Sequence, residues 1–148
     1  MRLLINRTIT NRLYTMGELY INGRKTTSTV EDTLTMLEAG RYQVRLGKCG
    51  SNARQIVIIP DHKTGAMVQK AHRFQAGGSH ISSRKHLSIC MGERLIPGSL
   101  KKGSKVYERL FDRLEKAEAR KESAVLTISD THVEAQDPIS LWDRPSSP

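Results

Sequence analysis

The dipeptide Asn22-Gly23 constrains the fold more than any other feature of this sequence. It separates two β-patterned runs, Gly17 to Ile21 and Lys25 to Val30. Asn and Gly both tolerate positive φ, which the two central residues of a type I′ turn require. The sequence therefore predicts a β-hairpin here, and the β-branched run from Leu3 to Thr10 predicts a strand beside it.

Polar and apolar residues alternate from Arg41 to Leu46. A period of two is typical of a strand with one buried face, so Arg41 and Arg45 should share the face that meets solvent or a ligand. Other short runs also favour strands: Gln55 to Ile59, which should be buried on both faces, Ser79 to Ser82, Leu87 to Met91, and Ala124 to Ile128.

One long helical pattern is present, between Ser104 and Lys121. Its apolar stripe comprises Val106, Leu110, Phe111, Leu114 and Ala117. Gly103 or Ser104 is a suitable cap. A weaker pattern, with Met67, Ala71 and Phe74 at i, i+4 and i+7, predicts a short second helix that ends near Phe74.

These elements predict one α+β domain over residues 1–130. The 148 residues suffice for a self-sufficient core. We expect a mostly antiparallel β-sheet or small barrel of six to eight strands, with one main C-terminal helix packed on it. Residues 131–148 lack periodicity and contain three of the five prolines, so they should form a mobile tail.

The chain has neither a signal-peptide pattern nor an apolar run long enough to span a membrane. We therefore expect a cytoplasmic protein without membrane contact. Cys49 and Cys90 are its two cysteines, and in a reducing compartment they should remain free thiols. The spacing of His72, His80, His86 and Cys90 matches no compact zinc pattern, so neither a metal nor a cofactor is predicted.

The net charge of +9 is concentrated in residues 41–100, which contain ten Lys and Arg against two acids. Such a segment favours an anionic partner, although basic residues also serve solubility. A nucleic acid could contact Arg41, Arg45, Lys48, Arg54, Arg73, Arg84 and Lys85. Tyr42 and Phe74 are the aromatic residues nearby, so binding should be salt-sensitive and indifferent to sequence.

Four segments occur in an order that resembles an uncharacterised domain family of bacteria, mobile elements and phages. They are Gly17 to Gly23, Val30-Glu31-Asp32-Thr33, Ala39 to Val44, and Ser88 to Glu93.

Adjacent strand residues face opposite ways, so the acids Glu31 and Asp32 favour a turn or loop-anchoring role over joint catalysis.

Members of that family carry a His-x-Gly-Asn stretch and a Gly-Cys-Ile segment that resemble a reduced signature of L,D-transpeptidases, which use a Cys thiolate for acyl transfer. Here His80 matches the histidine, and Ser88 takes the nucleophile position, two residues after His86. Ser88 and Cys90 should point to the same face of a strand, so Cys90 could replace the displaced nucleophile. The alternative is that both are structural strand residues.

The leading hypothesis is a mobile-element- or phage-associated accessory domain. Its transpeptidase-like cleft, around His80, His86, Ser88 and Cys90, would have lost catalysis and would bind a peptide or small molecule. The first alternative is a sequence-nonspecific nucleic-acid-binding protein that uses residues 41–85. The second is an active cysteine acyl-transfer enzyme.

Overall fold

A computed structural model describes residues 1–48, 53–60, 72–77, 88–94, 100–101 and 103–135. Its elements in chain order are β1 (Arg2–Thr10), β2 (Tyr14–Ile21), β3 (Arg24–Asp32), β4 (Gly40–Lys48), β5 (Arg54–Pro60), β6 (His72–Ala76), β7 (Ser88–Arg94), β8 (Leu100–Lys101), α1 (Gly103–Ala119), β9 (Ala124–Ser129) and β10 (Glu134–Ala135).

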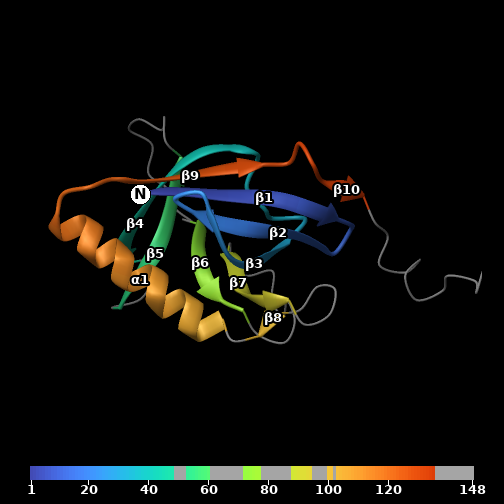
Figure 1. Cartoon of the computed structure of the whole chain (residues 1–148). Helices are drawn as coiled ribbons and strands as arrows, with labels where there is room; N and C mark the ends of the chain where they lie inside the picture. The colour runs from blue at the N-terminus through green and yellow to red at the C-terminus, as the bar shows by residue number, and fades with distance from the viewer. Residues whose placement is uncertain (49–52, 61–71, 78–87, 95–99, 102, 136–148) are drawn as a thin grey trace, which may run out of the picture.

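Eight of these strands form a closed barrel (Figure 1). The order is β1-β2-β3-β7-β6-β5-β4-β9, and β9 pairs with β1 to close the circle. The pairs β1–β9 and β6–β7 are parallel, and the other neighbours are antiparallel. The prediction of a mostly β architecture, in the form of a small barrel accompanied by one helix, is confirmed for the residues that the structure describes.

The hairpin between β2 and β3 forms as its turn residues predict. Asn22 has a φ of 51° and Gly23 a φ of 83°, the positive pair that a type I′ turn requires. Gly17 lies farther along β2, where a Cβ atom would approach within 3.0 Å of both the Asn6 carbonyl oxygen and the Thr29 hydroxyl. The neighbouring strands therefore leave little room for a side chain at this position.

Side chains fill the barrel, because alternate residues of every strand point inward. The interior is apolar along most of its length and comprises Leu3, Ile5, Leu19, Ile21, Tyr42, Val44, Leu46, Ile56, Ile58, Phe74, Ile89, Met91, Ala124, Leu126 and Ile128. This filling leaves the barrel ends and its outer face as the surfaces that can meet a ligand.

Helix α1 lies across one end of the barrel, beside β4, β6 and β7 (Figure 1). Leu110 and Leu114 are buried in the core from this end, as the apolar stripe predicts. β9 and β10 follow α1 in the chain, so the helix lies before the last strands. Among the described residues, no helix is long and apolar enough to cross a bilayer.

Three local predictions from the sequence are not simply confirmed by the structure. The short helix expected up to Phe74 is wrong at residues 72–74, which belong to β6, and its earlier part lies outside the described residues. The strand expected at Ser79 to Ser82 also lies outside them. Glu134 and Ala135, in the predicted tail, pair with Ile9 and Thr10 of β1.

Candidate functional site

The end of the barrel opposite α1 has a polar interior. Arg7 of β1 and Glu31 of β3 form a two-pronged ion pair there, with Nε–Oε2 at 3.0 Å and Nη2–Oε1 at 2.8 Å. Each side chain is 1% exposed. A buried pair of this kind contributes little net stability but is strongly destabilising when one partner is removed. The pair links β1 and β3 through the barrel interior, across the intervening strand β2.

Three interior side chains fasten the β3–β4 connection, residues 33–39, over this end. Arg7 Nη2 donates to the Leu37 carbonyl at 2.6 Å, and the Tyr42 hydroxyl donates to the Glu38 carbonyl at 2.6 Å. His72 Nε2 lies 3.0 Å from the Thr35 carbonyl. Because a carbonyl only accepts, Nε2 carries the proton.

The acids of the Val-Glu-Asp-Thr segment both support this connection. Asp32 accepts a hydrogen bond from the Leu34 amide at 2.9 Å, and Glu31 positions Arg7. The loop-anchoring role predicted for these acids is confirmed for Asp32, whereas Glu31 contacts Arg7 inside the barrel. Sequence reasoning did not find the partner, Arg7, because it lies 24 residues away and only the strand register brings it close.

Burial controls the ionisation of this cluster. It raises the pKa of Glu31, and the guanidinium of Arg7 opposes part of that shift. It also lowers the pKa of His72 and raises that of Tyr42. Because these side chains hydrogen-bond to one another or to the β3–β4 connection, this end of the barrel acts as a structural plug.

Ser88 and Cys90 share the outer face of β7, as predicted. Both are half-buried, and Cys90 packs against the outer-face cluster of Tyr14, Met16 and Val30. Burial raises the pKa of the Cys90 thiol, the charge of Glu31 adds to this, and a hydrogen bond with Ser88 opposes it. Such surroundings disfavour the thiolate that nucleophilic catalysis needs. His80 and His86 lie outside the described residues.

The basic residues of the middle segment differ in their surroundings. Arg41 and Arg45 are exposed on the outer face of β4, as the alternation predicts, and Lys48 is exposed at its end. Arg54 forms a two-pronged ion pair with Glu118, at 2.7 and 2.6 Å, so its charge is already matched.

The remaining members of the predicted nucleic-acid set contribute less. Arg73 is half-buried and donates to Gln55 at 2.8 Å, and Arg84 and Lys85 lie outside the described residues. Tyr42 and Phe74 are buried inside the barrel, 8% and 1% exposed. Both occupy inward positions of their strands, so neither of the aromatic residues noted near the basic segment can stack on a base.

A groove of about 630 Å³ crosses the outer face of β2, β1, β9 and β4. Its lining residues are Arg2, Leu3, Leu4, Tyr20, Gly23, Arg41, Val125 and Thr127. Leu4, which is 37% exposed, gives this groove an accessible apolar side chain. Sequence reasoning missed this surface, because Leu3, Leu4 and Ile5 form an unbroken apolar run and only the structure shows that Leu4 faces outward.

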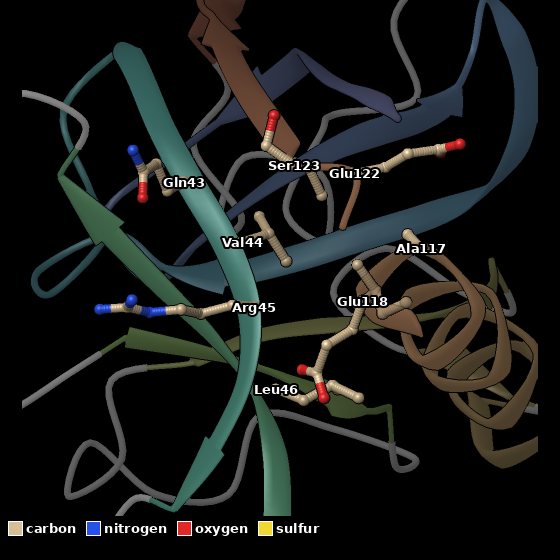
Figure 2. Close-up of a pocket in the computed structure, with 10 residues that line it drawn as sticks. Gln43, Val44, Arg45, Leu46, Ala117, Glu118, Glu122 and Ser123 are labelled. Carbon is tan, nitrogen blue, oxygen red and sulfur yellow. The ribbon is translucent and has the colours of Figure 1, made fainter. Parts of the chain in front are cut away.

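A second, smaller pocket of about 170 Å³ lies between β4 and the C-terminal part of α1. Figure 2 shows Val44 and Leu46 pointing toward the helix, whereas Arg45 points away from it. Glu118 reaches over this gap but is paired with Arg54. The pocket therefore offers apolar contact and a carboxylate that is already engaged.

No protein-family model, curated protein or solved structure matches this chain. The side chains themselves are therefore the evidence for what this chain can bind. In the part of the chain that the structure describes, no three His, Cys, Asp or Glu side chains gather closely enough to bind a metal ion. The outer-face groove combines basic side chains with accessible apolar ones, and it is the described surface best suited to a ligand.

Proposed function

We propose that this barrel binds nucleic acid without reading its sequence, through the outer face of β1, β2, β4 and β9. The observation that carries the proposal is the position of Arg2, Arg41 and Arg45, which are exposed on this one face. Phosphate contacts of this kind supply most of nonspecific binding. Because the barrel interior is filled, an extended ligand has to lie on the outside.

Charge on this face is largely positive. Glu18, the acid on the outer side of β2, forms an ion pair at 3.2 Å with Lys25 of β3. Since the charged groups here are exposed, their attraction for a polyanion should be screened by salt. The logarithm of the binding constant should therefore fall linearly with the logarithm of salt concentration, with a slope set by the number of phosphates contacted.

Replacing Arg41 and Arg45 together with alanine is expected to weaken binding of a fluorescent oligonucleotide at least about tenfold, because a hydrogen bond to a charged group contributes about 1.5–3 kcal/mol. The salt slope should fall by about one for each phosphate that the variant no longer neutralises. Fluorescence polarisation at several salt concentrations measures both quantities.

The matched control is Arg109→Ala with Arg113→Ala, which removes the same charge from the exposed side of α1. This variant should bind as the parent protein does. Equal weakening by both double variants would show that overall charge, and not this face, determines binding. Binding of the parent that does not change with salt would contradict the proposal outright.

A second proposal is that the surface around Ser88 and Cys90 is a transpeptidase-like cleft that binds a peptide or small molecule without catalysis. The shared outer face of these two residues and the raised pKa of the Cys90 thiol favour it. In this second proposal the protein is an accessory domain associated with a mobile element or a phage.

We expect Cys90 to react slowly with iodoacetamide at neutral pH. In a Cys49→Ser variant Cys90 is the single thiol of the chain, and its labelling rate should be lower in the native protein than in the same variant unfolded in urea. The physical reason is that burial raises the thiol pKa and also limits access. Labelling faster than in the unfolded chain, and abolished by replacing His80 or His86, would favour a cysteine acyl-transfer enzyme instead.

A further inference from the structure

Four neighbouring residues form one row across the groove. The strand register places Tyr20 of β2 beside Leu4 of β1, Leu4 beside Thr127 of β9, and Thr127 beside Arg41 of β4. With strands about 4.8 Å apart, the row extends about 14 Å from Tyr20 to Arg41. One end of the row is therefore aromatic and the other cationic.

The aromatic end is fixed in place. The Tyr20 hydroxyl donates to Glu18 Oε2 at 3.1 Å, and Lys25 lies 3.2 Å from the other oxygen of that carboxylate. Tyr20 itself is half-buried, so part of its ring meets solvent. A ring held in this way presents a surface at a small loss of conformational entropy.

The middle of the groove is apolar and its edges are basic. Leu4 and the half-buried Val125 form the floor. Arg2 of β1 and Arg41 of β4 line the groove beside this floor, and both side chains are exposed. Apolar and aromatic contact suits the faces of nucleobases, whereas guanidinium groups suit phosphates.

We infer that the groove binds single strands in preference to duplexes, with a base stacked on Tyr20 and phosphates on Arg2 and Arg41. This inference rests on the proposed function. A duplex stacks its bases on one another and presents phosphates outside, so it would use the arginines but leave Tyr20 and Leu4 without a partner. A second copy of this chain fits poorly, because two such basic faces would repel each other.

The test uses the full-length protein and a fluorescent oligothymidylate of about twelve nucleotides, with the matching thymidylate–adenylate duplex as competitor. Tyr20→Leu keeps an apolar side chain but removes the ring, and Tyr20→Phe keeps the ring. We expect Tyr20→Leu to weaken single-strand binding by about five- to a hundredfold. Tyr20→Phe should change it less than about twofold, and the duplex should compete weakly.

The outcomes separate this inference from the proposed function. Salt-sensitive binding that Tyr20→Leu leaves unchanged, or that the duplex abolishes as well as the single strand does, would overturn the stacking role and leave the polyanion proposal standing. Absence of any binding by the parent protein would overturn both. Tighter binding to phosphatidylserine vesicles, or a dimer that the oligonucleotide does not dissociate, would assign the groove to another occupant and overturn the inference. Thermal unfolding followed by circular dichroism verifies that each variant is folded.

Discussion

Replacing Arg7 with methionine is expected to lower the free energy of unfolding by about 3–5 kcal/mol, because it leaves the Glu31 carboxylate buried without its partner. The variant also loses the hydrogen bond to the Leu37 carbonyl. Urea denaturation at neutral pH measures the change as a lower midpoint, with the slope m unchanged if the native barrel is still compact.

The pH dependence of this variant follows from the ionisation of Glu31. Burial raises the carboxyl pKa in the folded protein, and the cation that opposes the shift is gone. A group whose folded-state pKa is raised stabilises the fold below its unfolded value and loses that contribution as pH rises through the folded value. The deficit of the variant should therefore shrink as pH is lowered from neutral toward the usual carboxyl range.

Two controls make this prediction specific. Arg7→Met combined with Glu31→Leu removes both charges and should cost clearly less than Arg7→Met alone, since apolar side chains can replace a buried pair at small loss. Lys25→Ala breaks an exposed pair and should cost less than about 1 kcal/mol. If the single Arg7 change proved as mild as the Lys25 change, the plug would not be a structural element of the barrel.

Gly103→Ala is expected to destabilise the fold by at least about 2 kcal/mol, because a tightly packed junction has no room for a methyl group. A Cβ atom there would overlap the Gly77 amide nitrogen and the Met91 carbonyl oxygen. Those two groups form a 2.8 Å hydrogen bond that joins the end of β6 to β7, directly beneath the start of α1. The substitution should therefore both weaken that hydrogen bond and displace the helix.

Gly47→Ala is the matched control. A Cβ on Gly47 would lie 3.6 Å from a Val57 methyl group, an ordinary van der Waals contact. Its unfolding midpoint should differ little from that of the parent, since alanine and glycine differ by about 1 kcal/mol or less in strands. Equal midpoints for the two variants would mean that α1 does not pack on β6 and β7 as described.

Local chemistry made much of the fold predictable. Asn22-Gly23 indicated the hairpin because few residues adopt positive φ, and the stripe that includes Leu110 and Leu114 indicated the helix. Alternation from Arg41 to Leu46 also predicted the correct outward face of β4. These signals are local, so they do not depend on how the strands pair.

Closure of the barrel was not predictable in the same way. β9 pairs with β1, from which it is more than a hundred residues distant in the sequence. It also pairs with β4, which lies about eighty residues before it. The pattern of Met67, Ala71 and Phe74 was weak evidence for a helix, since three apolar residues at suitable spacing also occur by chance. In β6 the inward residues are instead His72, Phe74 and Ala76.

The candidate site was predicted only in part. Arg41 and Arg45 were expected on an accessible face and lie there. Tyr42 and Phe74, the aromatic residues closest to it in the sequence, are buried at inward positions. The contribution of Tyr20 and Leu4 was not predicted, because the concentration of basic residues pointed to residues 41–85. The barrel order β2-β1-β9-β4 brings these two N-terminal residues onto the same face as Arg41.

The most direct test of the outer-face proposal is a nuclear magnetic resonance titration of the nitrogen-15-labelled full chain with oligothymidylate at low salt. We predict that the largest amide shift changes fall on Leu4, Tyr20, Arg41 and Val125, and that they shrink when salt is added. The largest changes on α1 or on the β3–β4 connection, or no changes at all, would contradict the proposal.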